Sequence, residues 1–94
     1  MFVLRIEHPV PDFDAWKRAF DRDPMGRAAS GVRRYRVLRP HDDPNYAVVE
    51  LELETIADVD ALHARLKELW GGVGGRIIGA PQSRVFELTE RRDC

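Results

Sequence analysis

Hydrophobic and polar residues alternate along several short segments of this chain. In residues 2–8, Phe2, Leu4 and Ile6 fall on one side and charged residues on the other. This period of two is that of a half-buried β-strand. The same alternation predicts further strands over residues 32–39, 46–54 and 83–90.

Two other segments repeat their apolar residues at the spacing of an α-helix. Phe13, Trp16 and Phe20 recur at i, i+3 and i+7 after Asp12, which suits the N-cap position. A second helix is expected from Thr55 to about residue 70, because its apolar residues follow the same spacing. Asp58 continues a capping-box-like pattern that begins at Thr55. Residues 22–31 are expected to form a loop with one helical turn.

Residues 40–45, PHDDPN, predict a turn that joins the second and third strands into a hairpin. One register places Arg36 opposite Glu50 and Arg34 opposite Glu52, so that opposite charges pair across the strands. Each such pair contributes only ~0.2–1 kcal/mol, but both favour the same register.

The order strand, helix, strand, strand, helix, strand predicts an α+β, ferredoxin-like domain over residues 1–94. Its four-stranded antiparallel sheet carries both helices on one face. The other face mixes apolar residues with charges of both signs, which suits either solvent or a second copy of the chain. The residues expected to face the helices are Phe2, Leu4, Ile6, Tyr35, Val37, Val49, Leu51, Phe86 and Leu88.

The overall charge balance excludes several classes of protein. Fifteen Lys and Arg residues oppose sixteen Asp and Glu residues, for a formal net charge of -1. Nucleic-acid binding needs an excess of cations, so we expect no nucleic-acid partner. No apolar run approaches the roughly 20 residues of a membrane span, and the first residues do not form a secretory signal. The only cysteine, Cys94, suits a reducing cytoplasm.

The chain resembles the dimeric α/β-barrel superfamily, in particular small domains similar to antibiotic biosynthesis monooxygenases. The resemblance spans nearly the whole sequence and rests on PVPDFDAWKRAFD, on the hairpin sequence and on the LW that ends the second helix. It implies a homodimer whose sheets pack face to face. Related members include cofactor-free monooxygenases, haem-degrading enzymes, isomerases, polyketide cyclases and proteins without known activity, so the resemblance implies a fold more than a reaction.

The haem-degrading members use an asparagine from the first strand, a tryptophan near the second helix and a later histidine. Here Trp70 matches the tryptophan, but the first strand has no asparagine and no histidine follows His63. We therefore expect no haem and no other cofactor.

His63 and Trp70 are the main candidate site residues, since a separation of seven places them on one stripe of the second helix. His63 would carry a proton, and Trp70, Tyr35 and Trp16 would hold a hydrophobic ligand between helices and sheet. The alternative is that His63 is a core-edge histidine with one hydrogen-bond partner and that the aromatic residues only pack.

The two other histidines, His41 and His8, are weaker candidates for a functional site. His41, Asp42 and Asp43 resemble metal ligands, but adjacent residues on a turn cannot easily converge on one ion, so we expect no metal site. His8 precedes Pro9 and is interpreted as a surface or loop residue, although the end of a central strand can border a pocket.

Gly71–Gly75 holds four glycines but follows a helix and precedes a strand, which is the wrong polarity for a phosphate loop. Gly71 or Gly72 suits the left-handed residue that ends a helix. The apolar pair Ile77-Ile78 is expected to pack on a partner subunit or to cover the mouth of the pocket.

Two functions remain as hypotheses. The first is a cofactor-independent monooxygenase, or an isomerase or cyclase, that acts on an aromatic or polyketide-like compound. The second is a dimeric ligand-binding or stress-related module without catalysis.

Overall fold

A computed structural model of the chain describes residues 1–24, 26–71 and 80–94. The predicted order of elements is confirmed. No helix in this part of the chain is long and apolar enough to cross a membrane. The elements are β1 (Phe2–Pro9), α1 (Phe13–Asp21), β2 (Val32–Leu38), β3 (Tyr46–Leu53), α2 (Ile56–Gly71) and β4 (Gln82–Glu87).

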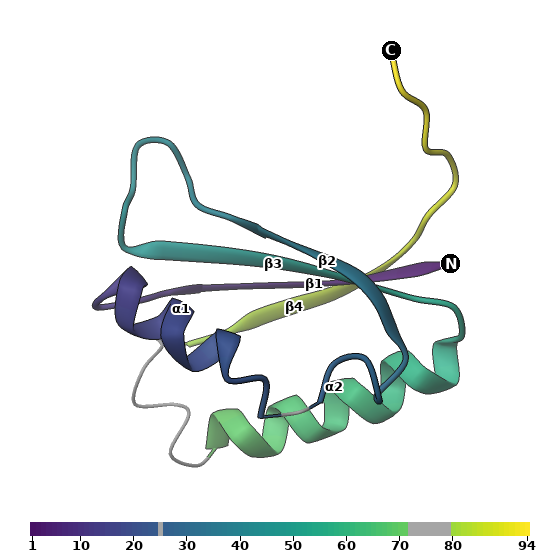
Figure 1. The fold of residues 1–94 in the computed structure, drawn as a ribbon, viewed down its shortest axis with the longest axis horizontal. Helices are drawn as coiled ribbons and strands as arrows, with labels where there is room; N and C mark the ends of the chain where they lie inside the picture. The colour runs from purple at the N-terminus through teal and green to yellow at the C-terminus, as the bar shows by residue number, and fades with distance from the viewer. Residues whose placement is uncertain (25, 72–79) are drawn as a thin grey trace.

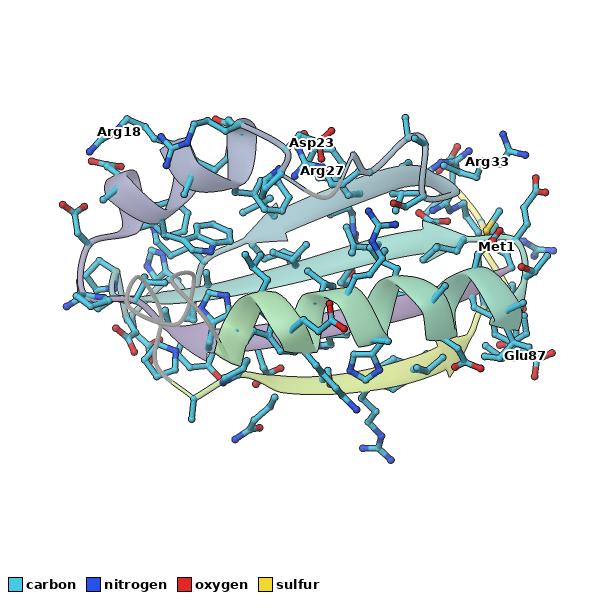
Figure 2. All side chains as sticks on the ribbon, turned by 90° about the horizontal axis from the view of Figure 1, so that it is seen from below. Met1, Arg18, Asp23, Arg27, Arg33 and Glu87 are labelled. Carbon is cyan, nitrogen blue, oxygen red and sulfur yellow. The ribbon has the colours of Figure 1, made fainter. Side chains whose placement is uncertain are left out.

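The four strands form one antiparallel sheet in the order β2-β3-β1-β4. Both helices cover the same face of this sheet, and the chain after β4 rises from the other side (Figure 1). Seen from the helix side, α2 runs over β1, and α1 lies nearer to β2 (Figure 2). The fold is therefore the ferredoxin-like α+β arrangement that the sequence predicts. We call the face without helices the open face.

The core lies between the helices and the sheet because alternate residues of the central strands point toward the helices. Leu4 and Ile6 of β1 and Val49 and Leu51 of β3 are all at most 5% exposed. From α2, Leu62 closes the core at 1% exposure. Phe2 and Val37 also pack against this core, as the alternation predicts.

Both helices begin at the predicted caps. The Asp12 carboxylate accepts a hydrogen bond from the backbone N–H of Ala15 at 3.2 Å, and Thr55 Oγ1 accepts one from Asp58 N–H at 3.1 Å. These contacts satisfy N–H groups that the first helical turn leaves unpaired. At the other end of α2, Gly71 has no positive φ, so the left-handed residue expected at Gly71 or Gly72 is not Gly71. The rest of 71–75 and Ile77-Ile78 lie outside the described residues.

The hairpin has the predicted register. Arg36 lies opposite Glu50, and Arg34 lies opposite Glu52. Arg36 donates to the Glu50 carboxylate, but the second expected ion pair does not form. Glu52 accepts instead from Arg91 of the C-terminal tail, because the tail passes over the end of the open face.

The last strand begins near the predicted residue but ends at Glu87 rather than at residue 90, and its side chains lie on the faces opposite to those expected. Phe86 pairs with Val3, and Val85 pairs with Leu4, so Phe86 and Leu88 belong to the open face rather than to the helix face. Glu87 pairs with Phe2, and both Met1 and Glu87 lie at the end of the sheet on the right of Figure 2. The error has a physical cause: both faces of this edge strand carry apolar and polar residues, so alternation alone does not orient it. Only pairing with β1 decides the face.

Candidate functional site

His63, Trp70 and Ser83 form a compact group where α2 meets β4. His63 Nε2 lies 2.6 Å from Ser83 Oγ, and the His63 and Trp70 ring centroids are 6.4 Å apart at 72°. The two α2 residues share one stripe of the helix, as the spacing of seven predicts. Ser83 reaches them because it pairs with Ile6, whose side chain faces the helices. The orientation of β4 therefore creates this contact.

The His63 imidazole is held in its neutral form near pH 7. Partial burial lowers its pKa below the ordinary 6.5, and the positive charge of Lys67 lowers the pKa further. Asp60 opposes both effects but is the smallest of the three. A neutral imidazole can accept a proton from a ligand, and Ser83 can orient the ring by donating to Nε2 or accepting from it.

The contact between His63 and Ser83 also resembles part of a nucleophilic serine site. Such a site needs a third group, usually a carboxylate, that orients the histidine through its other nitrogen. Among residues 1–24, 26–71 and 80–94, no carboxylate makes a hydrogen bond to His63. The geometry supports proton transfer by His63 better than nucleophilic attack by Ser83.

Trp16 and Tyr35 belong to a row of aromatic rings under α1. The Trp16 ring lies 5.4 Å from that of Phe13 and 5.3 Å from that of Phe20, and Phe20 lies 5.3 Å from Tyr35. Trp16 is buried at 6% exposure, whereas Tyr35 at the edge of the sheet is 43% exposed. The row thus runs from the core to the surface.

Two arginines cover parts of this row. The Arg27 guanidinium lies 3.9 Å from the centroid of Phe20 and 4.7 Å from that of Tyr35, and it donates to the Phe20 carbonyl at 2.8 Å. Arg27 lies beside Asp23 in the loop after α1 (Figure 2). Arg39 covers Phe13 at 4.7 Å. A flat ligand that stacks on the face of Phe20 or Tyr35 covered by Arg27 must therefore displace this arginine.

His8 lies inside the protein, so its interpretation as a surface or loop residue is wrong. It is only 3% exposed, and its ring meets that of Trp16 edge-on at 5.6 Å. The cause is the pleat of β1, which turns His8 to the same face as Leu4 and Ile6. The alternation of Leu4, Ile6 and His8 in the sequence could have predicted that His8 is buried. Pro9 obscured this pattern because a proline suggests the end of a strand.

The environment of His8 makes it a second neutral histidine. Its Nδ1 lies 3.3 Å from the Pro9 carbonyl, which can only accept, so Nδ1 carries the proton and Nε2 is left as an acceptor. Within the described part of the chain, Nε2 has no hydrogen-bond partner. Burial lowers the His8 pKa, and the backbone contact only partly opposes this effect.

The candidate residues thus form two groups. His63 and Trp70 lie together at α2, and Trp16 and Tyr35 are linked through Phe20 at α1. No ring contact between described residues joins the two groups. Ser83 is not among the site residues predicted from the sequence, and His8 is buried rather than at the surface. The Asp43 carboxylate of the histidine-aspartate turn accepts from Asn45 N–H at 3.0 Å, as expected of a turn residue.

Comparison of the fold with solved structures gives strong matches over most of the chain. A mutant form of SnoaB from Streptomyces nogalater, a cofactor-independent oxygenase, matches with a TM-score of 0.76 at 16% identity, covering 96% of this chain and 94% of that one. A structure described as an antibiotic biosynthesis monooxygenase matches with a TM-score of 0.70 at 11% identity, covering 96% of this chain and 100% of the other. A dimeric ferredoxin-like protein from an uncultured marine organism matches with a TM-score of 0.67 at 10% identity, covering 97% of each chain.

No protein-family model matches the sequence. No curated protein matches it either. The structural likeness confirms that the chain has the fold of antibiotic biosynthesis monooxygenase-like domains. At identities this low the likeness concerns the fold alone, because one fold hosts many activities.

Proposed function

We propose that this protein binds an aromatic or polyketide-like molecule between its helices and its sheet and transfers a proton to or from it without a cofactor. The observation that carries the proposal is the 2.6 Å contact between His63 Nε2 and Ser83 Oγ beside the Trp70 ring. It brings a neutral base, an orienting hydroxyl and an aromatic surface to one place.

Proton removal is sufficient chemistry for two kinds of reaction. In an isomerase or cyclase, His63 takes a proton from an acidic carbon and returns it elsewhere. In a cofactor-free monooxygenase, His63 removes a proton from a CH₂ group of the substrate, and the resulting carbanion reduces O₂. The overall reaction converts the CH₂ group and O₂ into a carbonyl group and water. Both reactions need a substrate that stabilises negative charge, as hydroxylated aromatic ketones do. The structural similarity to SnoaB, which is described as a cofactor-independent oxygenase, supports the second reaction.

The alternative is a non-catalytic ligand-binding or stress-related module. In that case the same residues hold the ligand, and His63 contributes only a hydrogen bond. Binding without turnover separates this function from the first.

The experiment compares His63→Asn with His41→Asn, because His41 lies exposed in the turn after β2 and its replacement removes the same kind of ring. A panel of anthrones and naphthols is tested by quenching of tryptophan fluorescence and by oxygen uptake or product formation. We expect turnover to fall ~10²–10⁴-fold in His63→Asn, the usual contribution of a general base, and to persist in His41→Asn. Equal turnover in both variants contradicts the role of His63, and binding without turnover by the natural protein favours the module.

We also propose that the protein acts as a homodimer that pairs through its open faces. Phe86 and Leu38 are 40% and 41% exposed on this face. A face that mixes apolar residues with charges of both signs suits contact with a second copy, because the charges can pair across a two-fold axis. The structurally similar ferredoxin-like protein that is described as dimeric supports a homodimer. Sedimentation equilibrium should give twice the chain mass, whereas a single-chain mass up to millimolar concentration contradicts the dimer. The cytoplasmic location stays a prediction from the sequence.

A further inference from the structure

The open face holds a buried carboxylate, that of Glu52, and the described residues donate to only one of its two oxygens. The Glu52 side chain is 7% exposed, and its Oε2 accepts from Arg91 at 2.6 Å. Its Oε1 is fully buried and has no hydrogen-bond donor among the described residues. A buried carboxylate oxygen without a donor is costly, so its presence indicates that a partner is missing.

The same face also carries an arginine, Arg34, whose guanidinium makes no ion pair with the described residues. Arg34 of β2 lies directly opposite Glu52 and is exposed. The neighbouring pair shows the contrast. Glu50 is contacted by Arg36 and lies 3.8 Å from Arg5, so its charge is compensated by two arginines.

A pocket of about 310 Å³ lies beside Glu52, between the sheet and the C-terminal tail. The tail stands on the side of the sheet opposite the helices (Figure 1), so a molecule seated on the open face would lie against it. A side chain of such a molecule that entered the pocket would therefore contact both Glu52 and the tail. The residues that line the pocket are Val3, Arg36, Glu50, Glu52, Leu88, Glu90, Arg91 and Arg92.

We propose that a second copy of this chain completes the Glu52 site, with Arg34 of each copy donating to Glu52 Oε1 of the other. A two-fold interface brings residue i to j and residue j to i, so one spare guanidinium and one spare carboxylate oxygen per copy are satisfied together. This symmetry is the reason to name a second copy rather than an unrelated cationic ligand. The proposal rests on the homodimer proposed above and names the contact that specifies it.

Glu52 Oε1 is buried within the single chain, so a donor from a second copy cannot reach it without a local rearrangement. A guanidinium reaches this oxygen only if the carboxylate or the tail residue Arg91 shifts. Either shift changes the contact between Arg91 and Glu52, so this contact is coupled to dimer formation, and Arg91 and the incoming Arg34 share one carboxylate. Bidentate and shared arginine contacts of this type are common for carboxylates, which have lone pairs for several donors.

The test is a double-mutant cycle on the dimer dissociation constant, measured by sedimentation equilibrium with Arg34→Ala, Glu52→Gln and the double variant. Arg33→Ala is the matched control, because Arg33 is the adjacent residue and pairs with Glu54 at 3.1 Å in its own chain. We expect each single variant to raise the dissociation constant at least about tenfold, the double variant to be no weaker than the single ones, and the control to be unchanged.

The outcomes separate the two proposals. A natural protein that stays monomeric overturns the homodimer. A natural dimer whose dissociation constant is unaffected by Arg34→Ala, or in which the two substitutions add independently, overturns the Arg34–Glu52 contact and leaves the homodimer standing. Arg34 is exposed in the single chain, so its replacement tests the interface without a folding defect, which circular dichroism verifies.

Discussion

The two faces of the sheet are formed by the same strands, but they differ in whether the described residues of the chain satisfy their buried side chains. On the helix face, Leu4, Ile6 and Leu51 are almost fully buried by residues of the same chain. On the open face, Glu52 is buried to the same extent, yet one of its oxygens has no donor in the described part of the chain. Apolar surface is satisfied by any apolar neighbour, whereas a carboxylate needs a donor at a defined position.

This difference shows where stability and specificity reside. Burial on the helix face supplies most of the free energy of folding, because it is roughly proportional to apolar area. The charged pairs of the open face contribute little to that free energy, but they decide which surface fits them. The three predictions that follow test this contrast.

The largest expected effect is on the core of the helix face. Leu4→Ala should lower the free energy of unfolding by about 2–5 kcal/mol, since Leu4 is 0% exposed and its removal leaves a cavity. Val3→Ala, one residue away on the open face, should cost under about 1 kcal/mol in dilute protein. Urea denaturation measures both. Equal losses would contradict the contrast, and a Val3→Ala cost that rises with protein concentration would show that a partner covers this face.

A smaller effect concerns the buried His8 on the helix face. Its pKa is lowered in the folded state, so the unfolded chain takes up a proton first as the pH falls below 6.5. The contribution of His8 to stability is therefore fully present above pH 6.5 and decreases below it until the folded pKa is reached. His63, whose pKa is also lowered, contributes in the same direction.

Replacement of His8 by Phe should remove part of this dependence. We expect the difference in Tm between pH 7.5 and pH 5.5 to shrink by a few degrees, about the effect of a fraction of a kcal/mol in a domain of this size. Differential scanning fluorimetry at both pH values measures it, with His41→Gln as the control that keeps the natural dependence. An unchanged difference in His8→Phe would indicate that other groups cause the acid sensitivity.

The smallest effect is expected for the Arg36–Glu50 pair of the open face. Its side chains are 66% and 18% exposed, so solvent screens the attraction. A double-mutant cycle on the free energy of unfolding should give a coupling of about 0.2–1 kcal/mol that weakens with added salt. A coupling well above this range would place the charged face among the main determinants of stability.

The local structure of this protein could be predicted from its sequence because it depends on neighbours along the chain. The period of two gave the strands, the spacing of three and four gave the helices, and the side chains of Asp12 and Thr55 marked their first turns. The charges of Arg36 and Glu50 were sufficient for the hairpin register, since only a short turn separates those strands. The pairing of His63 with Trp70 followed from helix geometry alone.

The remaining features depend on contacts between distant parts of the chain, so only the tertiary structure decided them. The pairing of β4 with β1 turned Ser83 toward His63 and Phe86 toward the open face, because the edge strand has apolar residues on both sides. The packing of α1 buried His8 against Trp16. The tail brought Arg91 to Glu52 across 39 positions, where local charge pairing had indicated Arg34. Alternation specifies which residues share a face, but a partner element must specify what covers that face.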